Sequence, residues 1–286
     1  MNLFNVIFFI FLFLLGLSIG SFINAVVYRL KTGRRIIRAR SICPKCKKKL
    51  GFVDLIPLIS FIMLRGRCRT CRQKISWQYP LVELATGIIF VLIFYYQILV
   101  TDHWSPITFI PLLFYLFIAV CLIAIFVYDL KYSLIPDRII WPAIIVNLVY
   151  AASAIILYLL KYKEIFYRLY PHTWPEVYNP WYILYGVLIG GGFFLILVLV
   201  SRGRWMGGGD IKLGILMGLL LGYPLIILAL MIAFVTGAIC GLILIALKKK
   251  TMKSQIPFGP FLIAATFISL FWGAQILNWY LGALLK

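Results

Sequence analysis

The sequence predicts an all-α polytopic membrane protein with about eight transmembrane helices and a small cytoplasmic four-cysteine, zinc-binding loop domain between the first two helices. Three observations predict this class. Hydrophobic residues make up 64% of the 286 residues and the mean hydropathy is +1.03, far outside the range of soluble domains. Apolar runs long enough to cross a bilayer recur along the chain. The one long polar segment between them contains two Cys-x-x-Cys pairs.

Eight apolar segments account for the expected helices. The first is too long for the apolar core of a signal peptide. It also lacks a preceding basic segment and a small-residue cleavage pattern, so we expect it to remain as a membrane span. The sixth is short. The eight segments are 4–28, 81–100, 107–128, 139–160, 182–200, 211–222, 224–247 and 258–283.

The distribution of basic residues predicts the orientation. Of the 28 Lys and Arg residues, 15 lie in residues 29–80. If that segment is cytoplasmic and the spans alternate, nine more are inside and four outside, which is a strong positive-inside pattern with both termini outside. The net charge of +20 then faces anionic membrane lipid and requires no nucleic acid. The other inner segments are 129–138, 201–212 and 248–255.

The same reading divides the chain into three parts. Residues 1–28 form the first transmembrane helix. Residues 29–80 form the cytoplasmic zinc-binding loop domain. Residues 81–286 form a seven-helix membrane domain.

The loop domain contains the pairs CPKC at 43–46 and CRTC at 68–71, separated by 21 residues. Two thiolates at this spacing hold one side of a tetrahedral metal, and two such pairs complete a four-thiolate zinc site without an open position. Two disulfides are the alternative, which a reducing cytoplasm disfavours. A domain of about 50 residues with little apolar content also needs a stabilising element such as zinc. The predicted structural-zinc ligands are Cys43, Cys46, Cys68 and Cys71, whereas Cys121 and Cys240 lie in spans and are expected to pack there.

Three of the eight acidic residues, Asp129, Asp137 and Asp210, fall at the cytoplasmic ends of predicted spans. An acid at membrane depth is a functional-site hypothesis by default. Asp137 follows a proline where a span begins, so it also reads as a helix N-cap. Asp129 ends a span, where the helix dipole disfavours negative charge. Capping explains Asp210 but not the three glycines before it. The remaining acids are expected at the surface or the membrane interface: Asp54, Glu83, Asp102, Glu164 and Glu176.

Two carboxylates at one depth on different helices, Asp129 and Asp210, predict an aspartic dyad. Carboxylates held a few ångströms apart cannot both ionise and therefore share a proton. The ionised one would take a proton from water while the other donates to a peptide carbonyl, which is hydrolysis without a catalytic metal. A proton-coupled transporter using the same pair is the main alternative, although no inverted repeat of broken segments is visible. A membrane-anchored zinc module that binds nucleic acid is a second alternative, but it leaves these acids unexplained.

Five motifs follow one another along the chain: GSFINAVVYRL at 20–30, CPKC continued by DLIPLISFIMLRGRCRTCRQKISWQYPLVELATG at 54–87, YDLKYSLIPD at 128–137, GGGD at 207–210 and IPFGPFL at 256–262. In this order they resemble the bacterial type IV prepilin peptidases, the bifunctional leader peptidase and N-methyltransferase family of GxGD intramembrane aspartic proteases. The four-cysteine loop favours this branch over presenilin-like and archaeal preflagellin peptidases. The family's opening motif commonly continues Arg-Leu-Pro, whereas this chain has RLKTG.

The resemblance implies a function. Such an enzyme cleaves the basic leader from type IV prepilins and pseudopilins at the cytoplasmic face of the bacterial plasma membrane. It then methylates the new N-terminal residue from S-adenosylmethionine, and the loop domain is associated with the methyl transfer. Carried onto this chain, the family motifs make Asp129 and Asp210 catalytic, Asp137, Gly207 and Gly209 supporting, and the four loop cysteines zinc ligands.

The methyltransferase site has no readable motif, because no Gly-rich turn follows a strand. The stretch LRGRC at 64–68 offers Gly66 and Arg67 as candidates. The alternative is that Gly66 forms a turn of the zinc knuckle and that Arg67 is a surface charge. The IPFGP element is expected to line the substrate groove, since its prolines leave backbone groups that must be buried or hydrated.

Overall fold

The structure is a computed structural model that describes residues 3–35, 40–101, 109–160, 162, 180–251, 254 and 256–284. Over these residues the chain is α-helical, which confirms the predicted class. The predicted outer acids Asp102, Glu164 and Glu176 lie outside the described residues. The helices are α1 (Leu3–Lys31), η1 (Val53–Leu55), α2 (Ile59–Met63), α3 (Gln78–Thr101), α4 (Phe109–Tyr132), α5 (Asp137–Leu159), α7 (Pro180–Ser201), α8 (Gly208–Leu221), α9 (Leu225–Ala246) and α10 (Gly259–Leu284).

Each of the eight predicted apolar segments forms a helix. Within the described part of the chain, seven of these helices are long and apolar enough to cross a membrane. The exception is α8, whose 14 residues span about 21 Å against a hydrocarbon core of about 30 Å. The predicted count is therefore confirmed for seven spans and not for the short sixth segment. The domain boundaries at residues 28 and 80 stay predictions, and α1 and α3 each extend a few residues into the predicted loop.

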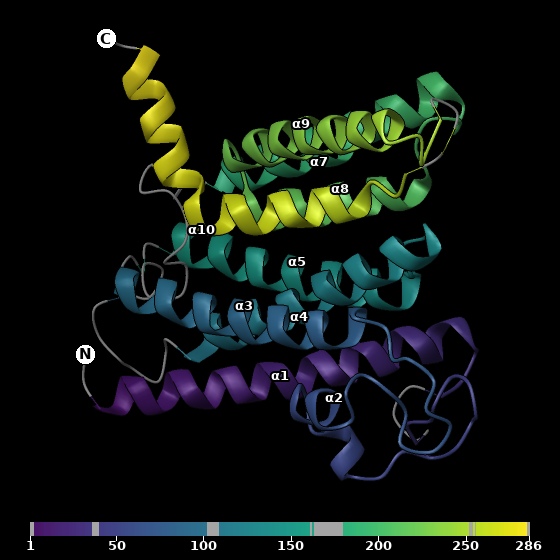
Figure 1. Ribbon diagram of the computed structural model, residues 1–286. Coiled ribbons are helices and arrows are strands. Elements are labelled where there is room, and N and C mark those ends of the chain that lie inside the picture. The colour runs from purple at the N-terminus through teal and green to yellow at the C-terminus, as the bar shows by residue number, and fades with distance from the viewer. Residues whose placement is uncertain are drawn as a thin grey trace.

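The two ends of the helix bundle differ in what they carry. Figure 1 shows the N-terminus and the C-terminus at one end, and the loop domain between α1 and α3 at the other. The connections from α4 to α5, from α7 to α8 and from α9 to α10 also lie at the loop-domain end. The segments predicted to be cytoplasmic thus share one end of the bundle, as the charge pattern requires.

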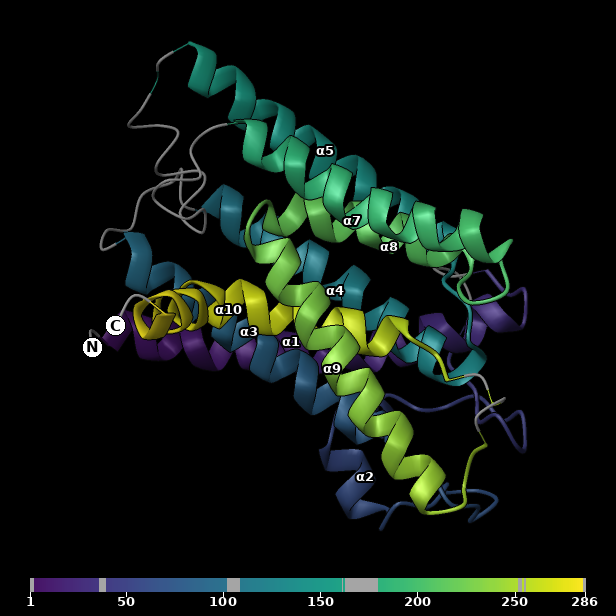
Figure 2. The ribbon, with the colours of Figure 1, turned by 90° about the horizontal axis from the view of Figure 1, so that it is seen from above.

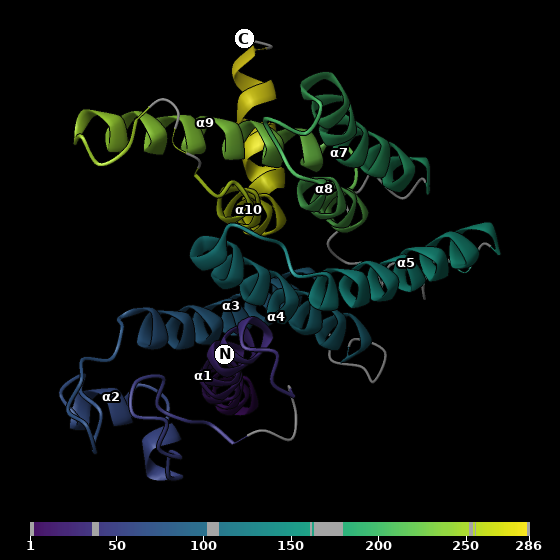
Figure 3. The ribbon, with the colours of Figure 1, turned by 90° about the vertical axis from the view of Figure 1, so that its right-hand side faces the viewer.

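The central helix is α4. Of its membrane segment, 72% is buried inside the protein, and it packs against α1, α3, α5 and α10. Viewed along the bundle, α1 and α3 lie on one side, and α7, α8 and α9 lie on the other (Figure 3). Seen from above, α9 crosses the bundle at an angle (Figure 2). Helix α4 therefore lies between the pair α1 and α3 and the helices α5 and α10.

Helices α7 and α8 pack backbone to backbone through glycines four residues apart. Gly186 and Gly190 of α7 face Gly218 and Gly214 of α8. A Cβ atom added at Gly190 would lie 2.4 Å from the carbonyl oxygen of Gly214, and one at Gly186 would lie 2.5 Å from that of Gly218. Small residues at this spacing let helices approach closely inside a membrane. The glycines therefore hold the short α8 against the full-length α7.

Helices α1 and α3 also pack closely through glycines, on the other side of the bundle. Gly16 and Gly20 of α1 meet Gly87 and Glu83 of α3. A Cβ atom at Gly16 would lie 2.7 Å from the Cα of Gly87, and one at Gly20 would lie 2.7 Å from the Cα of Glu83. This close approach places Glu83 directly against the backbone of α1.

Candidate active site and four-cysteine centre

Asp129 lies in the last turn of α4 and is only 5% exposed. The backbone N–H of Gly259, the first residue of α10, donates a hydrogen bond to its carboxylate. A Cβ atom at position 259 would lie 2.6 Å from Oδ2 of Asp129. Only glycine lets the N-terminus of α10 approach the carboxylate this closely. The positive end of the α10 dipole then compensates for the unfavourable position of Asp129 at the end of its own helix.

Asp210 is the third residue of α8 and is half-buried. Its carboxylate accepts a hydrogen bond from the backbone N–H of Gly207 at 3.1 Å, which caps the first turn of the helix. A Cβ atom at Gly209 would lie 3.1 Å from Ile135, so this glycine admits the chain that follows α4. Gly208 has no atom within 4 Å of such a Cβ, and the nearest atom at Gly207 is 4.0 Å away. The face of Gly207 and Gly208 is therefore open.

The structure brings the two predicted catalytic acids together. The carboxylates of Asp129 and Asp210 interact electrostatically, although they come from α4 and α8. Each also accepts a backbone N–H, from Gly259 and Gly207 respectively. Two neighbouring carboxylates with separate donors can divide the roles of acid and base between them.

Asp137 was expected to be the N-cap of this helix, but it is the first helical residue of α5, one position after the N-cap. Its carboxylate forms an ion pair with Lys212 of α8, whose ammonium group also lies 5.4 Å from the centre of the Trp141 ring. Lys212 follows Asp210 by two residues. The ion pair thus joins the start of α5 to the second turn of α8, the helix that carries Asp210.

The four loop cysteines form one cluster, in which all Sγ atoms lie within 4.8 Å of one another. The Sγ atoms of Cys43 and Cys71, one from each pair, are 4.0 Å apart. Zinc–sulfur bonds of about 2.3 Å in a tetrahedron place sulfurs about 3.8 Å apart, so the cluster fits a four-thiolate metal ion. All four are free thiols, and the 4.0 Å between the Sγ atoms of Cys43 and Cys71 is about twice the length of a disulfide bond.

The two cysteine pairs fold in the same way. In each, the residue after the second cysteine has a positive φ, 58° at Lys47 and 53° at Arg72. The N–H of Lys47 donates to the carbonyl of Cys43 at 3.0 Å, and that of Arg72 donates to the carbonyl of Cys68 at 2.9 Å. A short antiparallel bridge closes each knuckle. This repeated turn aims both thiols of each pair at a common point.

Without a bound metal, the thiols of this cluster differ in pKa. Backbone N–H groups of Cys71 and Thr70 lower the pKa of the Cys68 thiol to about 7. At Cys71 the backbone of Gln73 lowers the pKa, but burial and the three neighbouring thiols outweigh it and raise the pKa to about 11. Four thiolates in this space need a cation to compensate their charge.

The loop residues predicted for methyl transfer lie beside the second knuckle. Gly66 has φ of +66°, and a Cβ atom there would lie 3.1 Å from the Phe61 ring. Arg67 is exposed and forms the bridge with Lys74. These positions place Gly66 in a turn of the knuckle, and a role for either residue in methyl transfer stays a prediction.

Two acids differ from their predicted surroundings. Asp54 was expected to be a solvated surface charge, but its side chain is 15% exposed and pairs with Arg69 at 2.9 Å. Glu83 was expected at the interface, but it is 7% exposed and lines a cavity of about 350 Å³ between the loop domain and helices α1, α3 and α4. Neither Gly66 nor Arg67 lines this cavity. A lone acid in an apolar span is a signal that could have marked Glu83.

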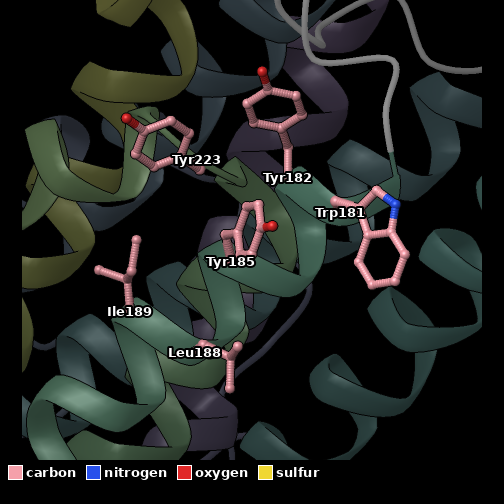
Figure 4. A pocket seen from close by; sticks show the side chains of 6 residues that line it. All are labelled: Trp181, Tyr182, Tyr185, Leu188, Ile189 and Tyr223. Atoms are coloured by element: carbon pink, nitrogen blue, oxygen red, sulfur yellow. The ribbon is translucent and has the colours of Figure 1, made fainter.

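A second hollow, of about 450 Å³, lies at the opposite end of the bundle. Figure 4 shows the aromatic side chains of Trp181, Tyr182, Tyr185 and Tyr223 that line it. The rings of Tyr182 and Tyr223 are stacked, 5.8 Å between their centres. Trp and Tyr side chains are enriched at membrane–water interfaces. The hollow belongs to this aromatic belt and lies far along the bundle from the two aspartates.

Comparison with known proteins extends over nearly the whole chain. Residues 14–97 match the family model described as the bacterial peptidase A24 N-terminal domain, and residues 116–242 match that of the type IV leader peptidase family. The first covers most of α1, the loop domain and most of α3. The second covers both aspartates. No solved structure matches the chain.

Curated relatives named prepilin leader peptidase/N-methyltransferase align with the chain along their length. The protein of Aeromonas salmonicida is 29% identical over 308 residues, covering 98% of this chain and 96% of the relative. That of Legionella pneumophila is 29% identical, covering 94% and 93%. That of Bacillus subtilis is 28% identical, covering 94% and 96%. With two family models matching in sequence order and relatives aligned from end to end, this chain belongs to the type IV leader peptidase family.

Proposed function

We propose that this protein cleaves the basic leader peptide from type IV prepilins and pseudopilins and then methylates the new N-terminal residue from S-adenosylmethionine. The observation that carries the proposal is the meeting of Asp129 and Asp210 at the loop-domain end of the bundle. The names of the full-length relatives agree with both activities.

The proposed location is the bacterial plasma membrane, with the loop domain and the active site in the cytoplasm and both termini outside. The basic segments at the loop-domain end support this orientation, because Lys and Arg are retained on the cytoplasmic side. Anionic inner-leaflet lipid is the partner of that surface, with no role for nucleic acid. A prepilin held there presents the junction between its basic leader and its apolar helix to the two aspartates.

In the proposed mechanism the ionised aspartate of the pair accepts a proton from water, whose oxygen attacks the peptide carbonyl carbon. The protonated aspartate donates to the carbonyl oxygen, and the C–N bond then breaks as the amine leaves with a proton. Gly259 and Gly207 hold the two carboxylates through their N–H groups. The open face of Gly207 and Gly208 leaves room for an extended substrate backbone beside Asp210.

Zinc in this proposal is structural. The cysteines at 43, 46, 68 and 71 would hold it, and with four protein ligands it has no position for substrate. A bound metal supplies folding free energy to a loop domain whose described residues contain only short helices.

The proposed function is tested by incubating the purified full-length protein, in proteoliposomes, with a synthetic prepilin and S-adenosylmethionine. We expect mass spectrometry to show loss of the leader, followed by the gain of one methyl group on the new N-terminus. A prepilin that stays intact would overturn the proposal and favour the transporter alternative.

Replacing Cys43 by serine is expected to lower zinc affinity by about tenfold or more, because one of four ligands is lost. Without the metal the loop domain should become sensitive to trypsin between residues 29 and 80. The measurements are zinc content per chain and limited proteolysis. Cys240→Ser is the matched control, since that thiol lies in α9 outside the cluster. Equal zinc content in Cys43→Ser and the control would contradict the assignment.

A further inference from the structure

We propose that the cavity between the loop domain and helices α1 and α3 binds S-adenosylmethionine, with Glu83 beside the sulfonium group. The inference rests on the methyl-transfer half of the proposed function and assigns a site to that step. The cavity measures about 350 Å³, within the range of small-molecule sites.

The lining of the cavity matches the parts of this ligand. The aromatic rings of Tyr28, Phe61 and Tyr79 offer faces for an adenine and for a cation. Arg34 and Arg40 lie on the loop side, where they suit the ligand's carboxylate. Glu83 comes from α3, against the close contact with α1. The described lining is basic overall, with nine Lys and Arg residues against two acids, and Asp54 is already paired with Arg69. Glu83 is therefore the negative group beside which the sulfonium would lie, whereas the basic groups suit the ligand's carboxylate.

Glu83 is the feature that selects a cation. It is 7% exposed, and its carboxylate accepts the N–H of Leu58 at 2.9 Å and a hydrogen bond from Ser21. No Lys or Arg among the residues that the structure describes lies within ion-pair distance of it, whereas Asp54 in the same wall pairs with Arg69. A buried carboxylate without a counter-ion is unfavourable, so a bound cation stabilises it. A sulfonium carries charge without N–H donors, which suits a carboxylate flanked by aromatic rings.

The backbone that Glu83 holds is strained. Leu58 has φ of 58° and ψ of −50°, and the N–H of Ile59 donates back to the carbonyl of Pro57 at 2.6 Å, which is a tight γ-turn. Such strain persists only where surrounding contacts hold it, and it gathers at ligand sites. Phe61 follows this turn in the cavity wall. The bond from Leu58 to Glu83 thus fixes that wall.

Gly66 does not line the cavity, but it contacts two residues that do. It packs against the ring of Phe61, and its carbonyl accepts the N–H of Ile75 at 2.7 Å. Phe61 and Ile75 both line the cavity. A side chain at position 66 would therefore disturb the cavity without touching the ligand.

The cavity lies at the same end of the bundle as the two aspartates, because its lining includes Lys131, two residues after Asp129 in α4. In the proposed reaction, the amine released by cleavage is the acceptor of the methyl group. Its neutral nitrogen attacks the methyl carbon, the C–S bond breaks with its electron pair on sulfur, and the positive charge moves from sulfur to nitrogen. The product, S-adenosylhomocysteine, is a neutral thioether and loses its attraction to Glu83.

This charge change provides the test. Glu83→Gln keeps an oxygen for the Leu58 N–H but removes the charge. In the full-length protein we expect calorimetry to show S-adenosylmethionine affinity reduced by about tenfold or more, and S-adenosylhomocysteine affinity changed by less than about twofold. Ala25→Leu, which fills the cavity from α1, should weaken both ligands. Asp210→Asn should bind both as the wild type does.

The outcomes separate the two proposals. Equal weakening of both ligands by Glu83→Gln would mean a structural role for Glu83 and would overturn its assignment. Wild-type affinity in both Glu83→Gln and Ala25→Leu would place the donor elsewhere and leave the proposed function standing. A wild-type protein that cleaves prepilin but neither binds S-adenosylmethionine nor methylates would overturn the methyl-transfer half of the proposed function itself. Ultraviolet cross-linking of radiolabelled S-adenosylmethionine to the wild type needs no variant, and label outside the cavity-lining peptides would also refute the site.

Discussion

Replacing either Asp129 or Asp210 by asparagine is expected to reduce prepilin cleavage by about 10³-fold or more, with the protein still folded and inserted. Asparagine preserves the size of each side chain and an oxygen for the N–H of Gly259 or Gly207, but it removes the proton that the pair shares. The measurement is the cleavage rate of a synthetic prepilin in proteoliposomes.

Asp137→Asn is the comparison variant for this experiment. Its carboxylate is exposed and pairs with Lys212 across the surface, so loss of the charge should lower the cleavage rate by no more than about tenfold through a less firmly held α8.

Methylation of a pilin that already lacks its leader should persist in Asp129→Asn and Asp210→Asn. If either variant cleaves near the wild-type rate, the dyad is wrong, and a proton or cation site becomes the better account of these acids.

Gly259→Ala should be the most damaging change at a residue without a functional side chain. The added methyl group would lie 2.6 Å from Oδ2 of Asp129, so either the carboxylate or the start of α10 must move. A displacement of about 1 Å in a catalytic group can cost about 10²-fold in rate, and we expect that loss in prepilin cleavage.

Gly192→Ala is the matched control for Gly259→Ala. It also lies in a membrane helix, but a Cβ atom there has no neighbour within 4 Å, and alanine is the better helix former. We expect its cleavage rate to match that of the wild type. Thermal unfolding of both variants shows whether Gly259→Ala acts on the site or on the fold. Normal cleavage in Gly259→Ala would show that the approach of α10 to Asp129 is not needed.

The parts of this architecture that repeat a simple chemical rule could be predicted from the sequence. Apolar length predicts the seven long spans, because the bilayer sets how long a helix must be. Cysteine spacing predicts the knuckles, whose turns are local. The common depth of Asp129 and Asp210 follows from counting spans. The length of α8 shows the limit of this reasoning, because glycine contacts with α7 hold a helix that is shorter than the bilayer requires.

The contacts between distant segments could not be predicted. Gly259 contacts Asp129 although most of the second half of the sequence separates them. The IPFGPFL motif does not indicate which of its residues makes that contact. The ion pair of Lys212 with Asp137 could not be predicted, since a lysine two residues after an aspartate has no special pattern. Glu83 carries a signal as an acid in an apolar run, but its strained partner Leu58 appears only once the loop folds over it.

The glycine contacts described above define two tightly packed helix pairs in this enzyme. The pair α1/α3 and the pair α7/α8 each pack backbone to backbone, so sliding within a pair would bring the two backbones into collision. Asp210 belongs to the second pair, whereas Asp129 comes from α4. The two aspartates therefore belong to different packing units, and their separation depends on the contact between those units. The donor cavity draws its walls from the first pair and its loop, with α4 as a neighbour. If a change in bilayer thickness tilts one helix pair against the other, we expect the rate of prepilin cleavage to change more than the affinity for the methyl donor.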